Sequence, residues 1–128
     1  MAEAPRSRKR VLVAEDDPAI ATLLKRVLSK DYDVTVANDG QSAIVLAAQT
    51  PPPQLLLLDV MMPGLDGIGV AQHVRTLPGM KSVPIIFLTA KGTPADVIRG
   101  IQHGARHYIT KPFKIEDLLA KVKKAIGS

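Results

Sequence analysis

The chain has no cysteine, no tryptophan and, among its 128 residues, only two tyrosines and two phenylalanines. Without cysteine there can be no disulfide bond and no thiolate metal site, which is compatible with a reducing compartment. No apolar run is long enough to cross a bilayer, and residues 1–10 lack the apolar segment of a signal peptide. We therefore expect a cytoplasmic protein that does not insert into a membrane.

Length and composition suit a single globular domain. Of the 128 residues, 46% are hydrophobic and 23% charged, enough for one sizeable core. We expect a basic N-terminal leader over residues 1–8 and one domain over residues 9–126. The formal net charge of +5 is uneven, because residues 1–66 carry seven basic and nine acidic residues, whereas residues 67–128 carry ten and three. With few aromatic side chains to stack on bases and no nucleic-acid-binding motif, direct nucleic-acid binding is not expected.

Short apolar runs alternate with amphipathic or alanine-rich segments along the chain. The runs predict strands, and apolar residues three or four positions apart predict helices. The predicted strands cover residues 11–14, 33–37, 55–58, 83–88 and 107–110, and the predicted helices cover residues 18–28, 41–49, 67–77, 94–103 and 115–126. Regular alternation predicts an α/β fold with a parallel sheet covered by helices on both faces. The leading candidate is a flavodoxin-like, doubly wound sheet of five strands in the order 2-1-3-4-5, with five helices.

Polar side chains follow four of these predicted strands. Glu15 and Asp16 follow the first and Asp59 follows the third, and these two strand ends are neighbours in the expected order. A cluster of carboxylates is unfavourable unless a cation lies among them, and oxygen ligands without His or Cys favour Mg²⁺. Thr89 and Lys111 add a hydroxyl and an ammonium group at the last two strand ends. Taken singly, these residues suit helix caps or surface positions, but together they indicate a site that handles phosphoryl groups.

Four segments carry a resemblance to a known family. Residues 11–17, 58–67, 89–90 and 108–113 together resemble, in the same order, the receiver domain of bacterial two-component response regulators. The segment Asp-x-x-Met-Pro-Gly-x-Asp-Gly that begins at Asp59, with a downstream Lys-Pro-Phe, is the most specific part. The resemblance covers roughly residues 9–126.

The resemblance implies a role for each site residue. Asp59 would accept a phosphoryl group from the phosphohistidine of a histidine kinase or a histidine phosphotransfer protein. Asp16 and Asp59 would bind Mg²⁺ directly, together with the carbonyl oxygen of Met61, and Glu15 would act through water. The protein would be no enzyme beyond its own phosphorylation and dephosphorylation.

The resemblance also implies a switch. Thr89 and Lys111 would bind the phosphoryl oxygens, and Tyr108 would swing inward as Thr89 moves. The bond between Lys111 and Pro112 would be cis. The face made by the fourth helix, the last strand and the last helix would then change its partner binding. Its basic residues predict a downstream protein with an acidic surface; they are Arg99, Arg106, Lys114, Lys121, Lys123 and Lys124.

Two departures from family patterns concern dimerisation and dephosphorylation. Residues 105–108 read Ala-Arg-His-Tyr where dimerising DNA-binding regulators have Ala-Asp-Asp-Tyr, so we expect a monomer or a weak dimer. Met61 and Lys91, each two residues beyond a site residue, are positions that tune dephosphorylation in this family. Because an apolar Met61 would orient attacking water poorly, we expect a long phosphoryl lifetime.

Two other classes of function stay open. An Asp-nucleophile phosphatase of the haloacid dehalogenase type would have a second aspartate two residues after Asp59, where this chain has Met61. A phosphorylation-independent docking module of receiver fold is the other alternative, and the intact set of site residues argues against it.

Overall fold

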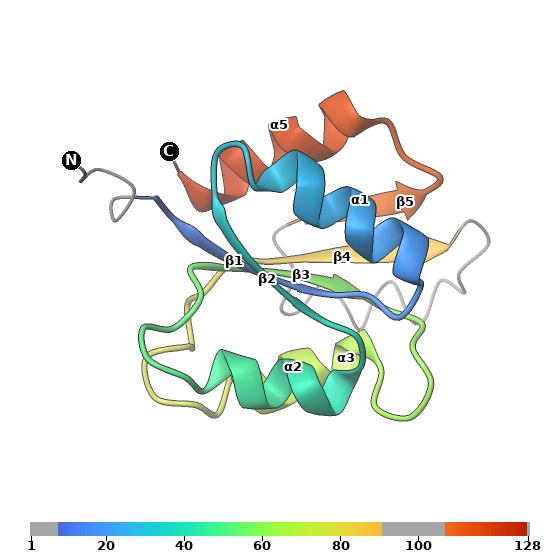
Figure 1. Cartoon of the computed structure of the whole chain (residues 1–128). Helices are drawn as coiled ribbons and strands as arrows, with labels where there is room; N and C mark the ends of the chain where they lie inside the picture. Colours follow the sequence, from blue (N-terminus) through green and yellow to red (C-terminus); the bar gives the residue numbers. More distant parts are fainter. Residues whose placement is uncertain (1–7, 91–106, 128) are drawn as a thin grey trace.

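The computed structural model describes residues 8–90 and 107–127. The strands are β1 (Arg10–Ala14), β2 (Asp33–Ala37), β3 (Leu55–Asp59), β4 (Ile85–Ala90) and β5 (His107–Lys111), and the helices are α1 (Pro18–Leu28), α2 (Gly40–Ala47), α3 (Gly67–Val74) and α5 (Ile115–Ile126). Strands and helices alternate, as predicted, from β1 to β4 and again from β5 to α5 (Figure 1). The predicted helix over residues 94–103 lies outside the described residues.

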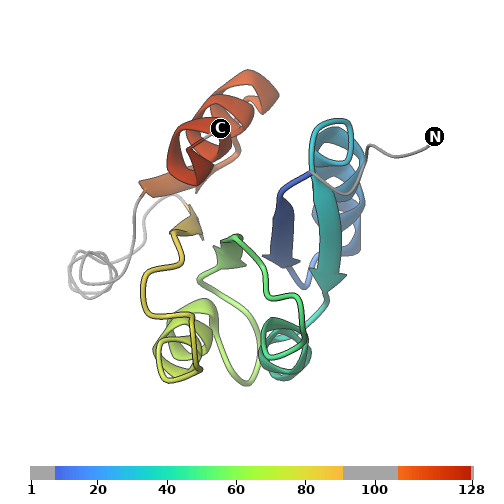
Figure 2. The same cartoon turned by 90° about the vertical axis from the view of Figure 1, so that its left-hand side faces the viewer.

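All five strands are parallel and lie in the order β2-β1-β3-β4-β5, which confirms the predicted doubly wound, flavodoxin-like sheet. Helices α1 and α5 cover one face of the sheet and α2 and α3 cover the other (Figures 1 and 2). No helix within residues 8–90 and 107–127 is both long and apolar enough to cross a membrane.

Strand β3 lies at the centre of the sheet and is buried on both faces. The side chains of Leu55 and Leu57 pack in the layer of α1 and α5, whereas Leu56 and Leu58 pack in the layer of α2 and α3. All four leucines have no exposed surface. A continuous apolar strand is what a parallel sheet covered on both sides requires, so the leucine run explains the position of β3.

Aspartates cap the N-termini of three helices. Asp17 accepts hydrogen bonds from the backbone of Ala19 and Ile20, and Asp39 and Asp66 each cap their helix by bonding the backbone N–H three positions on. These caps satisfy N–H groups that have no partner within the helix. Helix α3 ends at Val74, three residues before the predicted end at residue 77. The next residue, Arg75, lies beyond the helix, and its guanidinium donates to carbonyls of the loop that follows.

Three arginines bond main-chain carbonyls at the amino edge of the sheet. Arg8, placed in the leader by the sequence pattern, donates to the carbonyls of Ser29 and Tyr32 at the end of α1. The Nε atom of Arg10 lies 2.8 Å from the carbonyl oxygen of Pro52. The Nη1 atom of Arg75 lies 3.2, 3.0 and 2.7 Å from the carbonyl oxygens of three residues, Met80, Lys81 and Val83.

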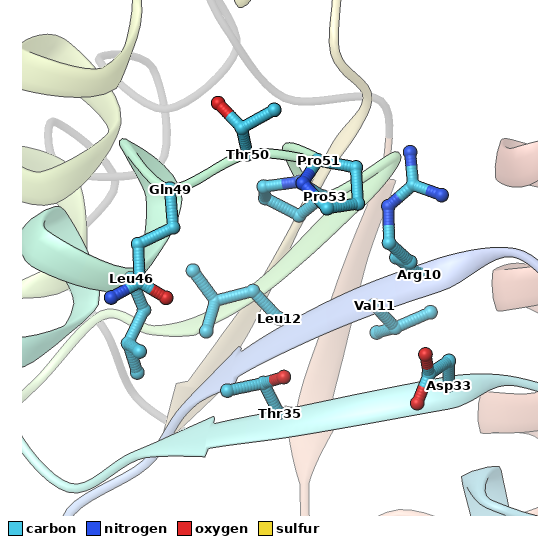
Figure 3. A pocket seen from close by; sticks show the side chains of 10 residues that line it. All are labelled: Arg10, Val11, Leu12, Asp33, Thr35, Leu46, Gln49, Thr50, Pro51 and Pro53. Atoms are coloured by element: carbon cyan, nitrogen blue, oxygen red, sulfur yellow. The ribbon is translucent and has the colours of Figure 1, made fainter.

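A pocket of about 230 Å³ lies beside Arg10 at this edge, between the start of β1 and β2 and the loop after α2 (Figure 3). Asp33 and Thr35 line it from β2, and Thr50 and Pro51 line it from the loop. The bond between Thr50 and Pro51 is cis, which the sequence pattern did not indicate. The predicted cis bond between Lys111 and Pro112 is confirmed.

Candidate functional site

The predicted polar residues meet at the carboxyl edge of the sheet, opposite the arginines. Strand β1 runs directly into Glu15 and Asp16, and Asp59 is the last residue of β3. In the sheet register Asp59 pairs with Leu88, so Thr89 lies one position further along the adjacent strand. Lys111 is the last residue of β5.

The three carboxylates form a compact group. Glu15, Asp16 and Asp59 each offer one oxygen atom, and these atoms lie within 4.8 Å of one another. Glu15 and Asp59 are buried, and Asp16 is half-buried. The Nζ atom of Lys111 lies 2.9 Å from Oε1 of Glu15 and 2.9 Å from Oδ2 of Asp59. One ammonium group therefore bridges two buried carboxylates at the ends of different strands.

Backbone N–H groups hold the other oxygen of each buried carboxylate. The N–H of Asp17 donates to Oε2 of Glu15 at 3.0 Å, and the N–H of Met61 donates to Oδ1 of Asp59 at 3.1 Å. Within the described part of the chain, Oε1 of Glu15 accepts no hydrogen bond of regular geometry, although the Lys111 ammonium is close. The ion pair with Lys111 therefore compensates the charge at this oxygen.

Burial and mutual repulsion raise the cost of charge at this edge. Burial, followed by the neighbouring Asp59, raises the pKa of Glu15 from 4.5 to about 7, although Lys111 and the N–H of Asp17 act in the opposite direction. Burial alone would lower the pKa of Lys111, but the two carboxylates outweigh it, so that this pKa is raised. A cation that joined the carboxylates would relieve the repulsion.

Mg²⁺ fits this group of residues. The ion prefers hard oxygen ligands and commonly binds through one or two carboxylates, keeping several of its waters. Here three carboxylate oxygens converge, and one buried oxygen lacks a regular hydrogen bond. Within residues 8–90 and 107–127, no histidine or cysteine joins this group, so the donor set described there does not suit softer metals.

The remaining predicted residues are placed as follows. Thr89 is buried at the end of β4, and Tyr108 is half-buried on β5 and packs against the layer of α2 and α3. The Met61 side chain is 64% exposed beside Asp59. Lys114 directly precedes α5, and three further lysines lie on it, at positions 121, 123 and 124. Lys91, Arg99 and Arg106 lie outside the described residues.

One contributor to the site was missed at the level of sequence. Gly67, the first residue of α3, is buried against the backbone of Asp59 and Val60. A Cβ atom at this position would lie 2.9 Å from the carbonyl carbon of Asp59 and closer still to its oxygen. The Asp-Gly pair at residues 66–67 marks a turn, but its spacing alone does not indicate so close an approach to the strand.

Comparison with known proteins identifies the family. The sequence model of the response regulator receiver domain matches residues 11–123. This chain belongs to the response regulator receiver domain family. It is therefore a receiver domain of two-component signal transduction, with the acidic cluster, the lysine and the buried threonine at the expected strand ends.

Two sequence relatives illustrate the match. The receiver domain is 43% identical over 117 residues to the DNA-binding response regulator MtrA of Mycolicibacterium smegmatis, covering 91% of this chain and 50% of the relative. It is 42% identical over 115 residues to the DNA-binding dual master transcriptional regulator RpaA of Synechocystis, covering 89% of this chain and 47% of the relative. The chain thus spans about half the length of these relatives.

Solved structures agree with the fold. The Francisella response regulator 1452 receiver domain superposes with a TM-score of 0.80 at 35% identity, over 93% of this chain and 97% of that one. The receiver domain of the sensor histidine kinase PA1611 from Pseudomonas aeruginosa gives a TM-score of 0.84 at 32% identity, over 95% of this chain and 100% of that one. That structure is described with a magnesium ion coordinated in the active site cleft.

Proposed function

We propose that this receiver domain accepts a phosphoryl group on Asp59 from a phosphohistidine of a histidine kinase or a histidine phosphotransfer protein. The observation that carries the proposal is the Lys111 ammonium group, 2.9 Å from both Asp59 and Glu15 at the carboxyl edge of the sheet. This ammonium group can exchange its contact with Asp59 for a contact with an incoming phosphoryl oxygen and still keep its ion pair with Glu15.

The transfer is a nucleophilic displacement at phosphorus. An oxygen of the Asp59 carboxylate forms the new P–O bond while the P–N bond of the donor breaks. The imidazole leaves with the electron pair of that bond, neutral because its other nitrogen carries a proton. Charge on the transferring group needs donors from several sides, and Thr89, Lys111 and the N–H of Met61 supply them.

Asp16, Asp59 and the carbonyl oxygen of Met61 would hold Mg²⁺, with Glu15 acting through a bound water. When bound, the ion supplies positive charge beside the phosphoryl oxygens. The convergence of the three carboxylates supports this assignment.

The test is to incubate the chain with acetyl phosphate and Mg²⁺ and to measure its intact mass. We expect one phosphoryl adduct, absent when EDTA replaces Mg²⁺ and absent in Asp59→Asn. An adduct that persists in Asp59→Asn, or no adduct at all, would contradict the proposal. Multiple-turnover hydrolysis of a phosphomonoester would instead identify a phosphatase.

Phosphorylation would be read out at the face that includes β5 and α5. The new charge acts on Thr89 and Lys111, and Tyr108 on β5 couples their movement to this face. Lys114, Lys121 and Lys124 give the described part of the face a basic character and support a partner with an acidic surface. Arg99 and Arg106, which the sequence pattern assigns to the same face, lie outside the described residues. Output binding that does not weaken with salt would argue against such a partner.

Four expectations of smaller scope belong to the proposal. The exposed Met61 side chain beside Asp59, with Lys91, supports slow dephosphorylation because it has no group to orient water. A monomer or weak dimer, the absence of direct nucleic-acid binding and a cytoplasmic location also stay predictions. The DNA-binding relatives do not decide whether this chain binds nucleic acid, because it matches only about half of their length.

A further inference from the structure

The loop between β3 and α3, residues 60–66, has a close contact with a helix outside the site. The loop begins beside Asp59 and carries Met61, whose N–H group bonds the Asp59 carboxylate at 3.1 Å. Its two ends are joined by a hydrogen bond of 3.2 Å from the N–H of Gly67 to the carbonyl of Val60. The position of Met61 therefore depends on how the rest of the loop is held.

Leu65 is the point at which the loop meets helix α2. Gly40, the first residue of that helix, is buried against the main chain of Leu65. A Cβ atom on Gly40 would lie 2.9 Å from the Cβ of Leu65, 3.0 Å from its carbonyl carbon and closer still to its carbonyl oxygen. Real Cβ atoms do not approach main-chain atoms so closely, so only glycine allows the observed arrangement.

Helix propensity does not explain a glycine at this position. Glycine is about 1 kcal/mol worse than alanine within a helix. Gly40 does not have a positive φ. The described glycines that do are Gly64, Gly79 and Gly127. The close approach of the loop is therefore the feature that requires glycine.

We propose that Gly40 is a positioning residue for the phosphorylation site, acting through the main chain of Leu65 to fix the loop that holds Met61 against Asp59. The inference rests on the proposed phosphoacceptor role of Asp59. It assigns a part in the chemistry to α2, a helix from which no predicted site residue comes.

The test is Gly40→Ala, read out in three ways. The added methyl group should push Leu65 away and displace the loop. We expect phosphorylation by acetyl phosphate to slow about tenfold or more, because a displacement of the order of 1 Å can cost up to about a hundredfold in rate. We also expect a changed ¹H–¹⁵N signal for the Met61 amide in the metal-free protein, and the urea midpoint records any loss of stability.

Two matched variants separate positioning from stability. In Gly69→Ala the added Cβ meets the tip of the Leu65 side chain, Cδ1 at 2.5 Å, which can rotate away. Ala43→Gly lowers the helix propensity of α2 without adding an atom. We expect both to phosphorylate at nearly the wild-type rate with an unchanged Met61 amide signal, even where the urea midpoint of Ala43→Gly falls.

The outcomes are distinct. A wild-type rate and an unchanged Met61 amide in Gly40→Ala would overturn the proposal, and so would an equal loss of rate in Ala43→Gly. If Gly40→Ala does not fold, Leu65→Gly loosens the same loop without a clash and should also slow phosphorylation; a wild-type rate there would overturn the proposal. If the wild-type chain takes up no phosphoryl group, the proposed function fails, and the Met61 amide signal still tests the positioning.

Discussion

The two edges of the sheet use charged side chains in opposite ways. At the amino edge each arginine donates to main-chain carbonyls, which are good acceptors and carry no net charge; the three are Arg8, Arg10 and Arg75. At the carboxyl edge Glu15 and Asp59 face each other around one ammonium group, and one buried oxygen lacks a regular hydrogen bond. Charged groups that bond the neutral main chain hold loops in place, whereas carboxylates grouped around a single ammonium have an excess of negative charge that suits them to bind a cation.

The largest effect is expected from Lys111→Met, which removes the bridging cation. Loss of one partner from a buried ion pair costs roughly 3–5 kcal/mol, and we expect about 3 kcal/mol here because the lysine is 21% exposed. Urea unfolding at pH 8 in EDTA measures it. Because Mg²⁺ can replace the lost positive charge, adding the ion should restore most of the stability. If the loss is the same with and without Mg²⁺, the carboxyl edge is not organised around charge.

The next effect is expected at the opposite edge, from Arg75→Ala. The guanidinium donates to three carbonyls of the loop before β4, and hydrogen bonds to charged groups contribute about 1.5–3 kcal/mol. We expect the free energy of unfolding to fall by about 2 kcal/mol, equally with EDTA and with Mg²⁺. The rate of phosphorylation well below the unfolding midpoint should not change. A dependence on Mg²⁺ would contradict the division between the two edges.

A smaller effect of opposite sign is expected from Glu15→Gln. The pKa of Glu15 is raised from 4.5 to about 7, so in the metal-free wild type the stability contributed by this group falls as the pH rises from 4.5 to 7 and does not change further above that range. The variant should lack this dependence. We expect it to be more stable than the wild type by on the order of 1–2 kcal/mol at pH 8 in EDTA, since each pKa unit corresponds to about 1.36 kcal/mol and the lost ion pair offsets part of it.

Equal pH profiles for Glu15→Gln and the wild type would show that Glu15 has an ordinary pKa. Magnesium provides the control for this variant. The ion should narrow or reverse the difference, because the wild type then keeps a charged Glu15 beside the metal.

The smallest effect is expected from Asp39→Asn, also at the carboxyl edge of the sheet. The Asp39 carboxylate caps helix α2 by accepting a hydrogen bond from the backbone N–H of Ser42. Its pKa is lowered by the backbone N–H of Ser42 and by the Ser42 side chain. The stability that its charge contributes is therefore present above pH 3.8 and is lost as the pH falls through the lowered pKa. We expect Asp39→Asn to lower the urea midpoint slightly at pH 7 and not at pH 2. A shift that persists at pH 2 would assign the effect to packing.

Much of the fold and site follows from local sequence. The leucine run identifies a strand buried on both faces, and the alternation of strands and helices leaves few sheet orders to consider. Because parallel strands end at one edge, the residues after four strands could be assigned to one site before any distance was known. The N-cap at Asp17 and the helix end at Gly127 follow from equally local rules.

What could not be predicted depends on contacts between distant segments. Gly40 and Leu65 are 25 positions apart, and nothing in either neighbourhood shows that they touch. The sequence pattern assigns Arg8 to the basic N-terminal leader, because nothing near it in the sequence shows that its side chain bonds carbonyls after the first helix. Helix α3 was predicted too long because Leu77 continues the apolar spacing, although its side chain packs from the loop beyond the helix.

The alternation of leucines in β3 has a consequence for how this domain can change over generations. Leu55 and Leu57 fill one side of the sheet and Leu56 and Leu58 fill the other, and the two sets belong to separate apolar clusters. A substitution in one cluster can be repacked within that cluster, because no side chain of the strand reaches both. The helices on the two sides can therefore diversify independently for new partners, while the strand between them keeps the Asp59 carboxylate in place.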